Sequence, residues 1–338
     1  MMMTYIWELA VGAFMISLIV QFVTIRYSEK FNYFIDCHLE EKPQKFHNTS
    51  TSRAGGIGIL LGMSVILLTP IGWKLLLSIL LAFLSGFFED LHRSLQPHIR
   101  LIMQLFAAGV AISLANAVIS YLGLGIYLPY TVAILFSMFS IVGLMNAMNI
   151  IDGFNGLASG AALLILLSLG HTTLLVGDEE MFNLILITFG TILAFFIINF
   201  PKGKIFLGDG GAYLIGFIIA LIGIFLAGAY PKISPWYILT ILIYPVWEVL
   251  FSIFRKLKAK HNPFHPDSYH LHMLVYKHIT HNNPLTSITI LSGYAPFILF
   301  SSLFPHNSKA NMVIALLFII GYTVIYRYLY RKETEGKI

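Results

Sequence analysis

The sequence has few charged residues and only one cysteine. Asp, Glu, Lys and Arg make up 11% of its 338 residues, whereas soluble domains carry about 25%. This shortage excludes an ordinary water-soluble globular protein, and a hydrophobic content of 57% excludes a disordered chain. Because Cys37 is the single cysteine, an intramolecular disulfide framework is also excluded. A polytopic membrane protein remains.

Long apolar stretches predict an all-α membrane fold. A bilayer core of roughly 30 Å needs about 20 apolar residues in a helix. Eleven stretches reach or approach that length: 5–25, 54–72, 74–88, 101–120, 129–148, 154–175, 181–200, 211–229, 234–254, 288–304 and 311–330. The crowded pair at 54–88 and the short stretch at 288–304 leave ten spans as an alternative. We expect one polytopic domain over residues 1–338.

The distribution of basic residues predicts the orientation. With the N-terminus outside and eleven spans, 18 of the 21 Lys and Arg residues fall in inside segments and at the C-terminus, as the positive-inside rule requires. We therefore expect a cytoplasmic C-terminus. The net charge of +5 then reflects cytoplasmic loops, and we expect no nucleic-acid partner. The expected cytoplasmic active-site loops are 26–53, 89–100, 149–153, 201–210 and 255–287.

Polar residues gather at the cytoplasmic ends of the expected spans. The four places are Glu89-Asp90, the segment 146–157, the segment 199–211 and the loop 262–272. Each has an ordinary interpretation, respectively a solvated helix end, polar contacts between helices, a glycine turn and surface histidines or zinc ligands. Their convergence at one face favours a site, because carboxylates near hydrocarbon are costly unless a cation or water meets them.

The residue types at this face suit a magnesium diphosphate. Mg²⁺ takes one or two protein oxygens and completes its shell with waters and phosphates, and Asp209 with Asn149 or Asp152 supplies such oxygens. Phosphate oxygens accept from cationic donors, and the candidates are Lys45, Arg53, His270, His272 and the basic run 255–260. Asp90 remains to orient or deprotonate a nucleophile.

Three motifs stand out within these segments: Asn-x-x-Asn-x-x-Asp-Gly-x-Asn-Gly-Leu at 146–157, Phe-Leu-Gly-Asp at 206–209 and Pro-Asp-x-x-His-Leu-His at 266–272. They resemble motifs of the polyprenyl-phosphate N-acetylhexosamine-1-phosphate transferases. The resemblance runs from about residue 36 to residue 275. It implies transfer of an N-acetylhexosamine-1-phosphate, such as GlcNAc-1-phosphate, from a UDP-sugar to undecaprenyl phosphate with release of UMP. The cofactor would be Mg²⁺, with Mn²⁺ as an alternative, and the location a bacterial plasma membrane with a cytoplasmic active site.

The same resemblance implies roles for individual residues. Asp209 would be a metal ligand with Asn149 as the second, and Glu89 and Asp90 would bind or deprotonate the lipid phosphate. The implied nucleotide-sugar contacts are Asp152, Gly153, Asn155, Asn199 and Phe206, while His270 and His272 lie near the diphosphate. The resemblance also allows a homodimer.

Two departures favour an initiator of a surface polysaccharide such as O-antigen. Glu89 replaces the first Asp of the usual pair, so Asp90 is the preferred base. The segment 47–56 and the His-Leu-His order at 270–272 differ from phospho-N-acetylmuramoyl-pentapeptide transferase, which remains the alternative.

Two other classes compete with the transferase interpretation. A secondary transporter would carry acids near span midpoints and a repeat between halves, whereas Glu8 and Glu248 are the only acids deep in expected spans. A non-catalytic scaffold gives no reason to gather Asp90, Asp152 and Asp209 on one face.

Overall fold

The computed structural model is almost entirely helical. It describes residues 2–31, 34–36, 51–92, 95–262, 265 and 267–335. The α-helices are α1 (Met2–Phe31), α2 (Gly55–Met63), α3 (Pro70–His92), α4 (Pro97–Ala115), α5 (Tyr130–Ile151), α6 (Leu157–Val176), α7 (Glu179–Asn199), α8 (Gly208–Ala229), α9 (Pro235–Ile241), α10 (Ile243–Lys258), α11 (Leu271–Val275), α12 (Asn283–Ser302) and α13 (Ser308–Glu335). A 3-10 helix η1 (Ser64–Leu68), a π-helix η2 (Tyr276–Thr280) and two antiparallel strands, β1 (Ile35–Asp36) and β2 (Thr51–Ser52), complete the set.

The structure confirms a multi-pass helical membrane protein but not the count of eleven spans. In the described part of the chain, nine helices are long and apolar enough to cross a bilayer, and α9 with α10 makes a tenth if that bent pair is one span. Most of the expected span 54–72 is formed by α2 and η1, and its last three residues belong to α3. The apolar segment Gly55–Leu68 is shorter than the roughly 20 residues that a bilayer core needs.

The expected span 234–254 is broken rather than continuous. Helices α9 and α10 meet at an angle of 78°. Pro245 explains the position of the break, because its ring clashes with the carbonyl of the residue four positions earlier and its nitrogen has no proton to donate. That carbonyl belongs to Ile241, the last residue of α9, and it accepts a hydrogen bond from the hydroxyl of Tyr294 instead.

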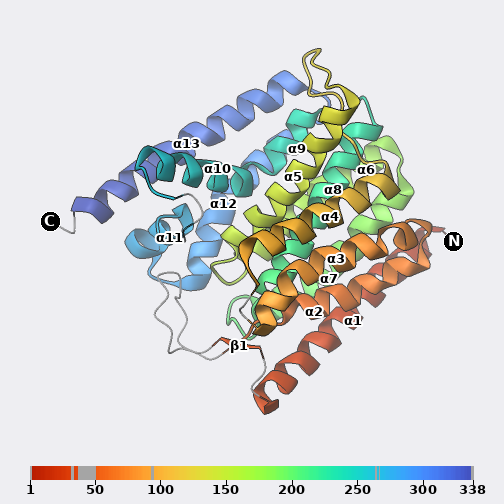
Figure 1. Ribbon diagram of the computed structural model, residues 1–338, viewed down its shortest axis with the longest axis horizontal. Coiled ribbons are helices and arrows are strands. Elements are labelled where there is room, and N and C mark those ends of the chain that lie inside the picture. The colour runs from red at the N-terminus through yellow and green to blue at the C-terminus, as the bar shows by residue number, and fades with distance from the viewer. Residues whose placement is uncertain are drawn as a thin grey trace.

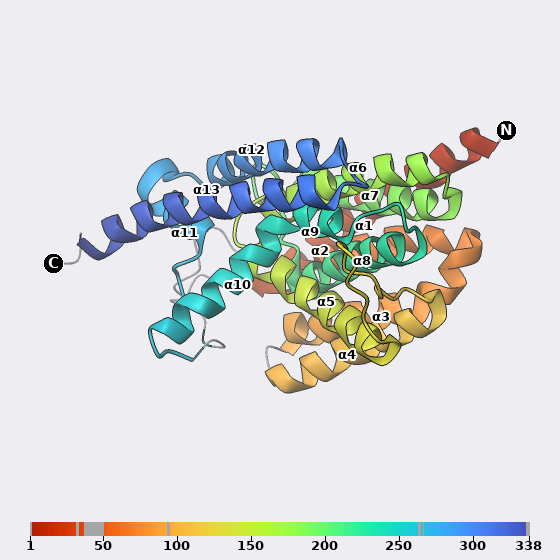
Figure 2. The ribbon, with the colours of Figure 1, turned by 90° about the horizontal axis from the view of Figure 1, so that it is seen from above.

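Helix α8 runs through the interior of the bundle, between α1 on one side and α13 on the other (Figure 1). Its 22 residues correspond to about 33 Å, so its two ends mark the two ends of the bundle. At the C-terminal end the hydroxyl of Tyr230 donates to Asp178 at 2.7 Å. Helix α13 extends past the bundle toward the C-terminus (Figures 1 and 2).

The N-terminal end of α8 is where several other helix ends converge. Glycines allow the close approach: a Cβ on Gly56 would lie 2.7 Å from Cα of Gly211, and one on Gly86 would collide with the backbone of Asp209 and Gly210. The neighbouring ends belong to α2, α3, α4, α5 and α7. The outward faces stay apolar and suit lipid contact, with exposed side chains such as Phe106, Leu135, Phe139, Leu316 and Val324.

Candidate active site

Asp90 caps the N-terminus of α8. Its Oδ1 accepts from the backbone N–H of Asp209 and its Oδ2 from that of Gly210, both at 2.9 Å. Amides in the first turn of a helix have no partner within the helix, and a carboxylate there also interacts favourably with the helix dipole. The end of α3 is therefore fixed to the start of α8, directly beside Asp209.

The carboxylate of Asp209 faces two arginines. Arg100 Nη1 donates to Asp209 Oδ2 at 3.0 Å, and Arg53 Nη2 lies 3.8 Å from Oδ1. Arg100 belongs to the first turn of α4 and Arg53 follows β2, so two distant segments bring positive charge to one carboxylate. The structure thus brings together Asp90, Asp209 and Arg53 as predicted, and it adds Arg100, which the sequence analysis did not single out.

Backbone contacts hold Arg53 in this position. The carbonyl of Ser52 accepts from the N–H of Phe206 at 2.7 Å, and the carbonyl of Phe206 accepts from the N–H of Gly55 at 2.9 Å. The segment with β2 therefore runs alongside the loop that leads into α8. The position of Phe206 at this loop is compatible with the predicted base stacking, which stays a prediction.

Asp152 lies within electrostatic reach of the same group. Burial raises the pKa of Asp152 well above its ordinary value, and the negative charges of Asp209 and Asp90 raise it further while Arg53 lowers it. Asp152 ends α5, and its N–H donates to the carbonyl of Asn149 at 3.3 Å. Asp152 is therefore close enough to the N-terminal end of α8 to interact electrostatically with Asp209, Asp90 and Arg53.

This donor set fits a divalent cation of the magnesium type. In the part of the chain that the structure describes, no three Asp, Glu, His or Cys side chains converge as a complete metal site. Mg²⁺ does not need one, because it usually takes one or two carboxylates and fills its octahedron with waters and substrate phosphates. The mutual repulsion between Asp209 and Asp152 is the kind of electrostatic cost that a bound cation removes.

Asn155 and Asn199, the asparagines predicted to contact the nucleotide-sugar, hold loops close to these carboxylates. Asn199 accepts from the N–H of Gly156 at 2.6 Å and donates through Nδ2 to the carbonyl of Ile205 at 2.7 Å. Asn155 donates through Nδ2 to the carbonyl of Pro201 at 3.0 Å. Both side chains thus fix the loops before α6 and α8, and their contact with a nucleotide stays a prediction.

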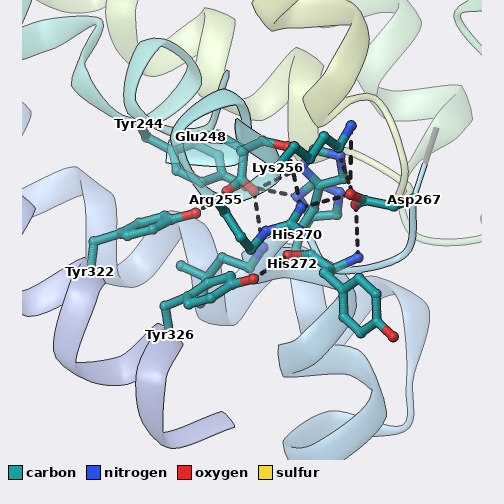
Figure 3. A network of polar contacts seen from close by, with 12 residues as sticks. Tyr244, Glu248, Arg255, Lys256, Asp267, His270, His272, Tyr322 and Tyr326 are labelled. Atoms are coloured by element: carbon teal, nitrogen blue, oxygen red, sulfur yellow. Dashed lines mark hydrogen bonds and ion pairs between the residues drawn. The ribbon is translucent and has the colours of Figure 1, made fainter. Parts of the chain in front are cut away.

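A second polar cluster contains the two predicted histidines (Figure 3). His270 Nδ1 lies 3.0 Å from Glu248 Oε1, and His272 Nδ1 lies 3.3 Å from the hydroxyl of Tyr244. The two imidazole rings are parallel within 2°, with centroids 5.5 Å apart. Tyr244 and Glu248 are four residues apart on α10 and share one face, so this single face fixes both rings.

His272 connects the second cluster to the first. It is fully buried, and burial lowers its pKa to about 4. Among the described residues its Nε2 atom has no hydrogen-bond partner. A Cβ added to Gly153 would lie 3.4 Å from that Nε2, and Gly153 directly follows Asp152. The orphaned nitrogen therefore faces the backbone beside the carboxylate group.

Basic residues continue beyond the histidines. Arg255 donates to Asp267 Oδ2 at 2.7 Å, and Lys256 Nζ lies 3.5 Å from the same oxygen. Burial disfavours the ionised form of Asp267, but the hydrogen bond and charge of Arg255 outweigh it and lower its pKa. A pocket of 370 Å³ opens beside this pair, lined by Lys256, Lys260, His261, Asn262, His265 and Asp267.

The remaining predicted residues have different outcomes. Glu89 lies next to Asp90, but its Oε2 accepts from the N–H of Leu95 at 3.2 Å and so connects the end of α3 to a residue shortly before α4. Asn149 is one helical turn before Asp152 and contributes a backbone contact, so its role as a metal ligand stays a prediction. Lys45 lies outside the described residues.

Comparison with known proteins assigns the chain to a family. Residues 73–227 match the family model described as Glycosyl transferase family 4. The chain is 30% identical over 270 residues to a Thermotoga maritima protein named undecaprenyl-phosphate alpha-N-acetylglucosaminyl 1-phosphate transferase, covering 79% of both chains. It is 28% identical to a Staphylococcus carnosus protein named phospho-N-acetylmuramoyl-pentapeptide-transferase, over 65% of this chain and 76% of that one.

A third relative is longer than the matched region. The chain is 29% identical over 259 residues, 68% of its length, to a Mycobacterium leprae protein named decaprenyl-phosphate N-acetylglucosaminephosphotransferase. It spans 65% of that relative's length. The Thermotoga match, by contrast, covers 79% of both chains at 30% identity. The chain therefore belongs to glycosyl transferase family 4, within the polyprenyl-phosphate N-acetylhexosamine-1-phosphate transferase superfamily.

Proposed function

We propose that the protein transfers an N-acetylhexosamine-1-phosphate, such as GlcNAc-1-phosphate, from a UDP-sugar to undecaprenyl phosphate. An oxygen of the lipid phosphate attacks the β-phosphorus, the bond from that phosphorus to the bridging oxygen breaks, and UMP leaves. The observation that carries the proposal is the convergence of Asp90, Asp152 and Asp209 with two arginines at one end of α8. Phosphoryl transfer needs alignment, a cation and charge neutralisation. The arginines of this group supply positive charge, and its carboxylates would hold the cation.

Each residue has a stated role in this proposal. Asp209 and Asn149 would hold Mg²⁺, with Mn²⁺ as an alternative, and the cation would supply positive charge to the diphosphate. Arg53 and Arg100 move away from Asp209 and donate hydrogen bonds to phosphate oxygens, because a guanidinium suits bidentate phosphate recognition. His272 Nε2 supplies a further polar contact.

The lipid and the nucleotide contact other residues. Asp90, with Glu89 beside it, orients or deprotonates the lipid phosphate. Phe206 stacks on the uracil while Asp152 and Gly153 line the same pocket. Lys45 and His270 donate to phosphates.

The proposal also includes location and polymer. We place the N-terminus outside, the C-terminus and active site on the cytoplasmic face, and the chain in a bacterial plasma membrane, since this arrangement follows the positive-inside rule. The product would start a cell-surface polysaccharide such as O-antigen. Similarity to the Staphylococcus carnosus protein keeps a UDP-muramoyl-pentapeptide donor as the second candidate.

A donor panel tests the proposal. Purified protein in detergent with undecaprenyl phosphate and Mg²⁺ should release UMP from UDP-GlcNAc or another UDP-N-acetylhexosamine, and EDTA should stop the release. Mass spectrometry of the lipid then identifies the transferred sugar, and light scattering separates a homodimer from a monomer. Release only from UDP-muramoyl-pentapeptide would favour the second candidate, and no release from any donor would contradict the proposal.

A further inference from the structure

Glu248 is a buried carboxylate in an otherwise apolar stretch of α10. Its side chain is 1% exposed, and such burial is costly unless every oxygen finds a partner. Oε1 accepts from the N–H of Leu271 at 3.0 Å and contacts His270 Nδ1 at 3.0 Å. Oε2 accepts from the hydroxyl of Tyr322 at 3.0 Å. All three partners are groups that donate hydrogen bonds.

This arrangement fixes the imidazole ring of His270. An ionised carboxylate only accepts hydrogen bonds, so Nδ1 of His270 is the donor in the contact with Glu248. The second ring nitrogen, Nε2, lies 3.9 Å from Asp267 Oδ1, which is beyond hydrogen-bonding distance. Glu248 therefore sets the ring orientation and leaves Nε2 for a ligand, and in the imidazolium form this nitrogen can donate to a phosphate oxygen.

Tyr322 belongs to α13, a helix that contributes no predicted site residue. Its ring is buried and stacks within 9° on that of Tyr326, with centroids 6.1 Å apart. The hydroxyl of Tyr326 donates to the carbonyl of Tyr269 at 2.9 Å. Figure 3 shows both tyrosines directed from α13 toward Glu248 of α10 and the segment that contains His270.

We propose that Glu248 is a positioning residue for His270 and that Tyr322 holds Glu248 in place. Helix α13 thus acts on His270 through Glu248 of α10. The inference rests on the proposed function in one respect, the contact of His270 with the diphosphate. Simple polar packing between α10 and α13 would give the same contacts, so the test must separate positioning from stability.

Removal of a single hydroxyl provides that separation. In Tyr322→Phe, Glu248 Oε2 loses its donor while the ring and its stacking remain, and we expect the kcat/KM for the UDP-sugar to fall about tenfold through its KM. The KM for undecaprenyl phosphate should stay unchanged. The matched control is Tyr237→Phe, which removes another fully buried hydroxyl that contacts Ser168 and Thr172. This control should stay within twofold of the wild type.

A double-mutant cycle tests whether Tyr322 acts through His270. If it does, Tyr322→Phe should have no further effect on kcat/KM in a His270→Ala background, since coupled residues are not additive. Effects that multiply, or a Tyr237→Phe defect as large as that of Tyr322→Phe, would overturn the proposal.

Hydrogen exchange gives a measurement that does not depend on activity. The amide of Leu271 donates to Glu248, so Tyr322→Phe should speed exchange in a peptide over 268–275 and leave one over 179–199 unchanged. Unchanged exchange over 268–275 would overturn the positioning role. If the wild type transfers no sugar but this exchange accelerates, the proposed function fails while the positioning of His270 stands.

Discussion

Both carboxylate oxygens of Asp90 accept backbone amides at the start of α8, and one of these amides belongs to Asp209. The residue predicted as the base is therefore also the clamp that positions the predicted metal ligand. Asp90 and Asp209 are 119 positions apart in sequence, and this contact joins α3 to α8 at the site. Substitution of Asp90 should change geometry as well as proton transfer.

Asp90→Asn tests this double role. Asn offers one acceptor oxygen for two amides, so we expect a loss of about 1 kcal/mol in the free energy of unfolding, as for a weakened helix cap. UMP release should fall at least about tenfold. Glu89→Gln is the control, since Gln can still accept from Leu95, and its unfolding free energy should change by less than about 0.5 kcal/mol. Thermal unfolding in detergent measures the stability of both variants. An Asp90→Asn protein as stable as the wild type would contradict the clamp.

Arg100→Gln tests competition between an arginine and the cation. Arg100 lies 3.0 Å from Asp209, so its removal should free the carboxylate and raise the affinity for Mn²⁺ without nucleotide about fivefold. UMP release should nevertheless fall, because the diphosphate loses a donor. Mn²⁺ binding by electron paramagnetic resonance gives the affinity. The control is Lys202→Gln, because Lys202 is exposed at the same end of the bundle; it should change neither Mn²⁺ affinity nor UMP release. Equal Mn²⁺ affinities for Arg100→Gln and the wild type would exclude competition.

Asp152→Asn tests the raised pKa of Asp152. Burial raises that pKa in the folded protein, with Asp209 and Asp90 adding to the effect, so the folded state retains a proton that the unfolded state loses near pH 4. The stability that the folded protein has with Asp152 protonated is complete below about pH 4, and it is lost as pH rises through the pKa of Asp152 in the folded state. Without metal, the Tm of Asp152→Asn should match the wild type near pH 4 and exceed it increasingly at higher pH. A constant difference would contradict the shift.

Much of the site could be predicted because helix ends alternate between two faces. Once the spans are placed, Asp90, Asp152 and Asp209 fall at the same end of the bundle, and the structure brings their charges together. The spacing of Asn149 and Asp152 by three residues likewise places them on neighbouring turns. These inferences need only the hydrophobic pattern and the period of a helix.

Arg100, Tyr322 and the bend in the ninth expected span could not be predicted in this way. Arg100 is one basic residue at the start of an apolar helix, and no spacing connects it with Asp209. Tyr322 depends on the tertiary packing of α13 against α10. Pro245 indicates the bend, but the stretch 234–254 is mostly apolar on both sides of Pro245, so the hydrophobic pattern does not show the change of direction.

The central claim is that Asp209 holds a divalent cation that carries the diphosphate. Metal-dependent UMP release by Asp209→Asn tests it most directly, with Asp178→Asn as the control, because Asp178 also lies at a helix N-terminus but at the opposite end of the bundle. The account predicts that Asp209→Asn folds but loses Mg²⁺-stimulated release, while Asp178→Asn keeps it. Full Mg²⁺-stimulated release by Asp209→Asn would contradict the account.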